Sequence, residues 1–209
     1  MPDVPATPAA PARSSEAPFP LDGDCDCRAV RYRLLTKPLF VHCCHCRWCQ
    51  RESGASFALN AMIESDRVQT LAGTPELINT PSDSGAGQQI ARCPHCRIAL
   101  WSHYAGAGPA VSFVRVGTLD EPDHLPPDIH IFTRSKQPWV VLPPGALAVE
   151  EYYERDQCWP AESLQRRQQL LPQIEAWQAL LRLEQQSEIK KLRGKVTWEG
   201  GLDAMGRDT

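Results

Sequence analysis

The 209-residue sequence predicts an all-β domain, built as an antiparallel β-sandwich or sheet pair, followed by a helical C-terminal extension. Between Asp22 and Tyr153, short segments rich in β-branched and aromatic residues alternate with turn residues, which is typical of antiparallel sheets. After Pro160 the composition changes to Glu, Gln, Arg and Leu, with apolar residues three and four positions apart. The length allows one domain with a core plus an appendage.

The first segment, residues 1–20, has six prolines among Ala, Ser and Thr. Because it has too little apolar material to offset the entropy of ordering, we expect a flexible leader without catalytic residues. It has no basic region followed by an apolar core, and the chain has no run of about 18 apolar residues. We therefore expect neither a signal peptide nor a membrane span.

The charge pattern excludes some classes of partner. The formal net charge is -3, and acidic and basic residues are interspersed without a basic stripe. Neither nucleic acid nor an anionic membrane surface is favoured as a partner. Nine cysteines in such a chain fit a reducing compartment, so we expect a cytoplasmic protein.

Eight segments of the domain, expected over residues 21–155, fit short β-strands. They are Ala29–Leu35, Phe57–Ile63, Arg67–Leu71, Glu76–Asn79, Gln89–Arg92, Ile98–His103, Ala110–Val116 and Ile129–Phe132. Gly- and Pro-containing stretches at 73–75, 81–87, 106–109 and 121–127 predict the turns and loops between them.

The C-terminal extension, residues 156–209, is expected to be helical with a flexible tail. Pro172 is expected to start a second helix or to kink one, and Gly194 to end it. The apolar stripe packs most often on its own domain and next most often on a partner subunit, which makes it a candidate surface for homo-oligomers. The stripe consists of Leu170, Leu171, Ile174, Trp177, Leu180 and Leu181.

Two cysteine pairs have the spacing of metal half-sites. Cys25 and Cys27 lie two residues apart, about 6.5 Å on extended backbone, and modest bending brings their sulfurs to the roughly 3.8 Å that one tetrahedral zinc requires. Cys93 and Cys96 form a C-x-x-C knuckle whose backbone N–H groups can solvate the sulfurs. Two half-sites supply the four ligands of a closed zinc site.

A third cluster, Cys44, Cys46 and Cys49, supplies three thiolates within six residues. Three protein ligands and one vacancy are the catalytic zinc pattern. The alternative is a fourth protein ligand from elsewhere. Cys43 and His45 are poor candidates for it, because on extended backbone they face away from Cys44 and Cys46. The remaining candidates are His42, His95, His103 and Cys158.

The order of these clusters resembles the glutathione-dependent formaldehyde-activating enzyme family, which includes centromere protein V. The segments Val114–Asp120 and Pro126–Phe132 and the downstream Trp139 add to the resemblance, which runs from about Leu21 to Tyr153. It implies an antiparallel β-sandwich or β-tent zinc domain with two zinc ions. The implied structural ligands are Cys25, Cys27, Cys93 and Cys96, and the implied catalytic ligands are Cys44, Cys46 and Cys49.

The chain departs from the family at two turns. Arg28 and Arg97 stand where the family usually has glycine, and each costs about 1 kcal/mol if its position requires a positive φ. We expect both knuckles to form with altered turn geometry. The two arginines are also candidates for shielding the negative charge of a four-thiolate zinc.

The resemblance implies a carbon–sulfur lyase or synthase that joins the thiol of glutathione, or a similar thiol, to formaldehyde or another small aldehyde. A vacancy on zinc suits this chemistry, because the dication holds a thiol as thiolate at neutral pH. Arg47 and Arg51 are candidates to receive substrate carboxylates. Trp48 is a candidate to line the site. His45, His95 and His103 are candidate general acids, but a structural role is the more common one for each of these histidines.

Two other functions fit the same residues. In the first, both zinc ions are structural and the C-terminal helices carry a partner surface. In the second, Cys43 beside Cys44, or the isolated Cys158, is a redox sensor that releases metal on oxidation. The sensor is the weakest alternative, because vicinal cysteines pair only in strained geometry.

Overall fold

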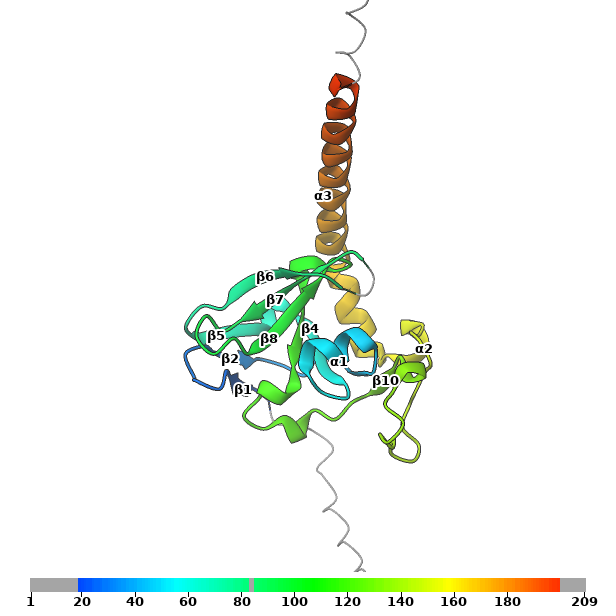
Figure 1. The fold of residues 1–209 in the computed structure, drawn as a ribbon. Coiled ribbons are helices and arrows are strands. Elements are labelled where there is room, and N and C mark those ends of the chain that lie inside the picture. The colour runs from blue at the N-terminus through cyan, green and yellow to red at the C-terminus, as the bar shows by residue number, and fades with distance from the viewer. Residues whose placement is uncertain (1–18, 83–84, 200–209) are drawn as a thin grey trace, which may run out of the picture.

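The computed structural model describes residues 19–82 and 85–199, which form a mostly β body and a long C-terminal helix (Figure 1). Its ten strands lie in two sheets. The larger sheet has the order β10 (Ile129–Ile131), β3 (Phe40–Cys44), β4 (Ala58–Glu64), β9 (Val111–Arg115), β8 (Ala99–Tyr104), β7 (Gln88–Arg92), β6 (Glu76–Thr80). The smaller sheet has the order β1 (Leu21–Asp24), β2 (Arg31–Leu34), β5 (Val68–Ala72).

The helices of the described residues are few, and most are short. Five are single 3-10 turns, at Ser65–Arg67, Gly108–Ala110, Val116–Thr118, Pro122–His124 and Thr133–Ser135. Three are α-helices: α1 (Arg47–Ser53), α2 (Arg155–Cys158) and α3 (Ala161–Glu199). None of the helices in this part of the chain has the length and apolar character needed to cross a membrane. The predicted leader lies outside the described residues except for Phe19 and Pro20, and the predicted tail lies outside them from residue 200.

The eight predicted strands are all present, with ends shifted by a few residues at most. Two strands, β1 and β3, were not predicted. All five residues of β3 are buried, so the strand lacks the alternation of apolar and polar residues that marks a half-exposed strand. The antiparallel prediction is wrong for one pair, because β10 runs parallel to β3, with Ile129 opposite His42.

The apolar core has two parts, and each contains one group of cysteines. The first part lies around Tyr32, whose ring meets that of Trp101 edge-on at 5.6 Å, and it includes Cys25 and Cys93. The second part includes Cys44, Cys46 and Cys49. Residues of α3 close this second part, so the helical extension packs on the same core as these three cysteines.

A buried ion pair fixes the first turns of α3 to the body. Arg166 donates to both carboxylate oxygens of Glu64 on β4, at 2.8 and 2.5 Å, and also to the carbonyl of Lys37. Both side chains are at most 10% exposed. About three turns further on, Trp177 donates to the carbonyl of Ala105 and covers Gly108, where a Cβ atom would lie 2.4 Å from the indole.

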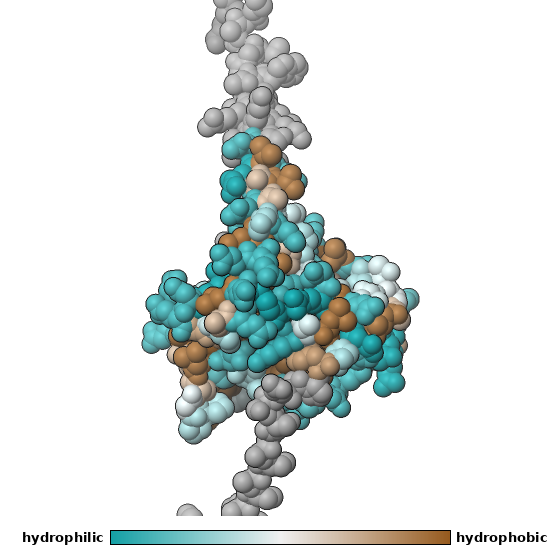
Figure 2. Space-filling model, turned by 180° about the vertical axis from the view of Figure 1, so that it is seen from behind, coloured by the Kyte–Doolittle hydropathy of each residue, from teal (hydrophilic) through white to brown (hydrophobic). Residues whose placement is uncertain are grey.

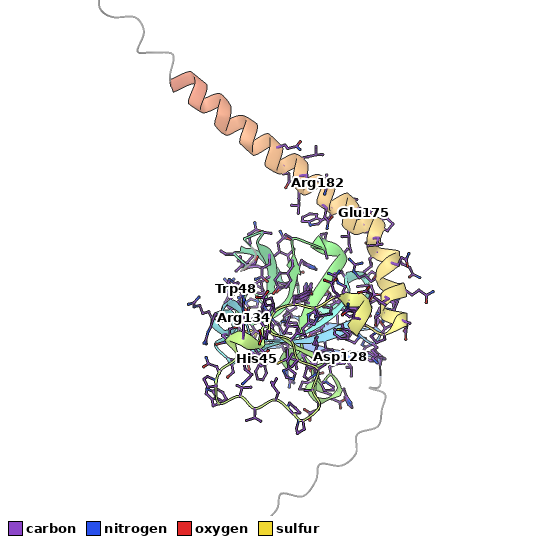
Figure 3. The ribbon with its side chains drawn as sticks, turned by 90° about the vertical axis from the view of Figure 1, so that its right-hand side faces the viewer. His45, Trp48, Asp128, Arg134, Glu175 and Arg182 are labelled. Atoms are coloured by element: carbon purple, nitrogen blue, oxygen red, sulfur yellow. The ribbon has the colours of Figure 1, made fainter. Side chains whose placement is uncertain are left out.

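Beyond these contacts α3 leaves the body (Figure 1). Pro172 lies inside one continuous helix, and the axis changes direction close to Glu175 (Figure 3), so the kink occurs and a second helix does not. The helix passes Gly194 without ending there. Leu170 and Ile174 are buried on the body, whereas Leu180 is 56% exposed. The stripe therefore packs on its own domain only in its first half.

The surface behind the view of Figure 1 is mostly hydrophilic, with hydrophobic residues in separate small patches (Figure 2). On the part of α3 that leaves the body, Leu183 is 62% exposed. A homo-oligomer through this helix stays a prediction.

Candidate metal centres and substrate cavity

The structure brings Cys25, Cys27, Cys93 and Cys96 together from two turns that are far apart in the sequence. Their four Sγ atoms lie within 4.8 Å of one another, and Cys27 is 3.6 Å from both Cys25 and Cys93. These separations are close to the roughly 3.8 Å between thiolates on one tetrahedral zinc. The group therefore fits a closed four-thiolate zinc site.

Backbone amides support this group. The Val30 N–H donates to Cys25 Sγ and the His95 N–H to Cys93 Sγ, each at 3.4 Å. Such donors stabilise the thiolate form and lower the pKa of a thiol. The pKa of Cys96 is lowered to about 6, mainly by the backbone N–H groups of Cys27 and Ile98. The turns thus favour the thiolate form of Cys96, whereas burial raises the pKa of Cys25 to about 11, so that this thiol would depend on a bound dication to ionise.

The prediction of altered turn geometry at Arg28 and Arg97 is wrong. Both residues adopt the left-handed conformation that favours glycine, with φ of 58° and 65°. The Arg28 and Arg97 N–H groups donate back to the carbonyls of Cys25 and Cys93, which closes the two turns. The arginines therefore keep the glycine-type turn and carry its conformational cost.

The second group, Cys44, Cys46 and Cys49, lies where β3 ends and α1 begins. The three Sγ atoms lie within 4.8 Å of one another, and each residue is less than 10% exposed. Cys46 is the N-cap of α1, and its sulfur accepts the Cys49 N–H at 3.3 Å. The short helix therefore places Cys49 back over Cys46, one turn along, and completes a three-thiol group.

The three thiols differ in acidity. The pKa of Cys46 is lowered, because the thiols of Cys44 and Cys49 and the N–H groups of Cys49 and Trp48 donate to its sulfur. The pKa of Cys49 is raised, since it donates to the other two sulfurs. Cys46 is thus the first of the three to ionise, and a bound dication would favour the thiolate form of all three.

A cavity of about 560 Å³ opens over these three thiols. Trp48, a candidate wall residue, lies in its lining. Most of the lining is apolar or aromatic, and the polar residues include His42, Asn60, Tyr104, Arg155 and Arg167. Burial keeps the phenol of Tyr104 protonated, because it raises the pKa of Tyr104, and burial lowers the pKa of His42 to about 4, so this imidazole is neutral at pH 7.

Cys43 and His45 do not join the three-thiol group, as the alternation along the strand predicts. They lie with His130 of β10 in a third group, in which His45 Nε2 is 3.6 Å from Cys43 Sγ and 3.0 Å from His130 Nδ1. The group could hold a metal ion, but the histidine hydrogen bond already satisfies two of its three ligand atoms. His45 is fully buried, and this bond ties the end of β3 to β10.

The other predicted site residues lie elsewhere. Arg47 and Arg51 line a separate surface hollow beside Trp139 rather than the cavity, so the structure does not support them as receivers of substrate carboxylates. His95 is exposed, and His103 binds the carbonyl of Val111. Cys158 lies in α2, outside every cysteine group among the described residues.

Several residues of the cavity and of the group around His45 have no signal in the sequence. Tyr104 ends β8 and resembles any half-buried strand residue, whereas Arg155 and Arg167 lie in the extension, where arginines normally face solvent. His130 lies in the 126–132 segment, which was noted only as part of a resemblance. The position of each of these residues depends on tertiary contacts, and no local sequence pattern indicates that it lies in the site.

Comparison with known proteins identifies the family. The family model described as glutathione-dependent formaldehyde-activating enzyme matches residues 20–135, which is more than half of the chain. The chain belongs to this family. The matched segment contains all three cysteine groups, whereas α2 and α3 lie beyond it.

This member of the glutathione-dependent formaldehyde-activating family is similar to one curated protein and to one solved structure. A Halomonas elongata protein named "Putative glutathione-dependent formaldehyde-activating enzyme" is 26% identical over 173 residues, which cover 79% of this chain and 98% of the relative. A crystal structure of a Rhodobacter sphaeroides protein aligns with 48% of this chain and 88% of its own, with 22% identity and a TM-score of 0.37.

Proposed function

We propose that this protein is a zinc-dependent carbon–sulfur lyase or synthase that joins a glutathione-like thiol to formaldehyde or another small aldehyde. The observation that carries the proposal is the contrast between the two thiol groups. Four converging sulfurs would complete the tetrahedral shell of one zinc, whereas Cys44, Cys46 and Cys49, which line a cavity, would leave one position on a second zinc for a substrate. Membership of the family supports glutathione and an aldehyde as substrates.

The three thiolates would hold zinc. The chemical role of the bound ion would be to keep the substrate thiol ionised at neutral pH. Three thiolates also weaken the ion as a Lewis acid toward water, so the site favours sulfur over hydrolysis. The apolar lining around Trp48 and Phe113 limits access of water to the reacting atoms.

The reaction is an addition without redox change. The thiol releases its proton on ionisation, a bond forms between its sulfur and the carbonyl carbon, and the C=O π bond breaks. The resulting alkoxide takes up one proton, equivalent to the one released, which gives a hemithioacetal (the S-hydroxymethyl thiol when the aldehyde is formaldehyde). Tyr104 lines the cavity as a protonated phenol, so we assign it the hydrogen bond to the developing alkoxide. His42 is less suited, because its Nε2 is already bound to the Tyr153 hydroxyl at 2.6 Å.

The test is the rate of S-hydroxymethylglutathione formation, measured by NMR exchange against the spontaneous reaction without protein. We expect acceleration by the native protein and by the Cys158→Ser control, and none by Cys46→Ser. Tyr104→Phe should keep the zinc and the thiol affinity and lower the rate roughly 10- to 100-fold. A native rate equal to the spontaneous one would refute the enzyme and leave a zinc-stabilised interaction module.

A further inference from the structure

The helical extension supplies one wall of the cavity over the three thiols. Arg155 and Trp159 come from α2 and the residue after it, and Arg167, Ile174 and Gln178 come from α3. All of them lie beyond residues 20–135, the segment that the family model matches. The extension therefore supplies a part of the cavity lining that lies outside the segment matched by the family model.

Two arginines in this wall lack a carboxylate partner. Among the described residues, neither Arg155 nor Arg167 has an acidic group within ion-pair distance, although Glu154 and Asp156 share a shallow outer hollow with them. The neighbouring Arg166 differs, because Glu64 binds it through both carboxylate oxygens. Arg166 is therefore paired with a carboxylate, whereas its neighbour Arg167 faces the cavity without one.

The two arginines lack a carboxylate partner, although Arg155 bonds to the Tyr152 side chain, and they are close enough to repel each other. Burial and the charge of Arg155 together lower the pKa of Arg167, in that order. Arg155 Nε is buried and has no hydrogen-bond partner, while the Arg155 guanidinium lies 6.0 Å from the ring centre of Trp159. Two adjacent like charges and an orphaned donor cost free energy, and a bound anion would offset that cost.

We propose that Arg155 and Arg167 form an anion subsite that binds a carboxylate of the thiol substrate while its sulfur reaches Cys44, Cys46 and Cys49. The inference rests on the proposed function and specifies its substrate as a thiol that also bears a carboxylate. A planar guanidinium binds carboxylates through two parallel hydrogen bonds, which fixes direction as well as affinity. The extension would then select the thiol, and the family-matched domain would carry the reaction.

The experiment measures thiol affinity of the zinc-loaded full chain by quenching of tryptophan fluorescence, since Trp48 and Trp159 line the cavity. The probes are glutathione, its diethyl ester, which keeps the thiol and loses both carboxylates, and 2-mercaptoethanol. Arg155→Gln and Arg167→Gln are compared with Arg182→Gln, an arginine on the projecting part of α3 (Figure 3). Zinc content and melting temperature are recorded for every variant.

We expect Arg155→Gln and Arg167→Gln each to weaken glutathione binding at least 10-fold, and to leave the ester and 2-mercaptoethanol within 2-fold of the native protein. Arg182→Gln should match the native protein with all three probes. Melting temperatures without ligand should not fall in Arg167→Gln, because its side chain has no ion pair to lose.

Two outcomes overturn the inference, and they are distinguishable. If glutathione and its ester bind native protein and variants alike, the anion subsite is wrong while thiol binding and the proposed function stand. If no thiol binds the zinc-loaded native protein, the proposed function fails and the subsite fails with it.

Discussion

Single residues decide which cysteines gather and which stay apart. One position along β3 separates Cys44, which faces the cavity, from Cys43, which lies with His45 and His130. The turn residues matter as much as the ligands. Arg28 and Arg97 occupy glycine-type backbone positions, so the four-thiol group forms at a local conformational cost.

Replacing Arg97 with glycine should show this cost. Arg97 also pairs with Glu76 on the surface, so the test uses a Glu76→Gln background, in which no ion pair is lost. There, Arg97→Gly should raise the free energy of unfolding by about 0.5–1 kcal/mol. Glycine removes the cost of holding a side chain at a left-handed φ, and part of this gain is lost because glycine raises the entropy of the unfolded chain. Zinc content should not change.

Chemical denaturation with and without Glu76→Gln measures the effect as a double-mutant cycle. A loss of stability in the Glu76→Gln background would mean that Arg97 contributes through the metal group itself. That result would favour the alternative in which its charge shields the thiolates.

At the scale of elements, α3 is the part whose position matters most for the cavity. Its first turns close the core that contains Cys44, Cys46 and Cys49, and its next turns line the cavity wall. The pair between Arg166 and Glu64 fixes this arrangement in a buried setting. Breaking a buried pair costs far more than breaking an exposed one, because the partner is left charged and desolvated.

Arg166→Met should therefore destabilise the protein by about 3 kcal/mol, toward the low end for buried pairs, since Arg67 lies 3.4 Å from Glu64 and compensates in part. Adding Glu64→Gln should recover most of the loss. Arg182→Met, on the projecting part of α3, should stay within about 0.5 kcal/mol of the native protein. Equal effects at Arg166 and Arg182 would contradict the anchoring role.

For the whole molecule, sequence patterns predicted what depends on local chemistry. Turn residues and β-branched runs located eight strands, and cysteine spacing grouped the seven clustered thiols as the structure places them. The missed features depend on tertiary contacts. Strand β3 was missed because all residues of Phe40–Cys44 are buried, so the segment lacks the alternation of apolar and polar residues. The parallel pairing of β10 with β3 was missed because the two strands are joined by a long connection.

The cavity could not be predicted for the same reason. Arg166 and Arg167 are neighbours in a polar helix, yet one binds Glu64 and the other lines the cavity. Neighbouring residues of an α-helix point about 100° apart, so their difference depends on which face of the first turns of α3 packs on the body, and the sequence does not specify that face. Arg47 and Arg51 are closer in sequence to Cys46 and Cys49, yet both lie outside the cavity lining.

The central claim is that one thiol group is closed and the other accepts a substrate thiol. The most direct measurement is the zinc content per chain combined with a glutathione titration of the cobalt-substituted protein, followed through the thiolate-to-cobalt absorption. We expect two metal ions per native chain, one perturbed by millimolar glutathione, and a single unperturbed ion in Cys46→Ser. One ion per native chain, or two that ignore every thiol, would contradict the account.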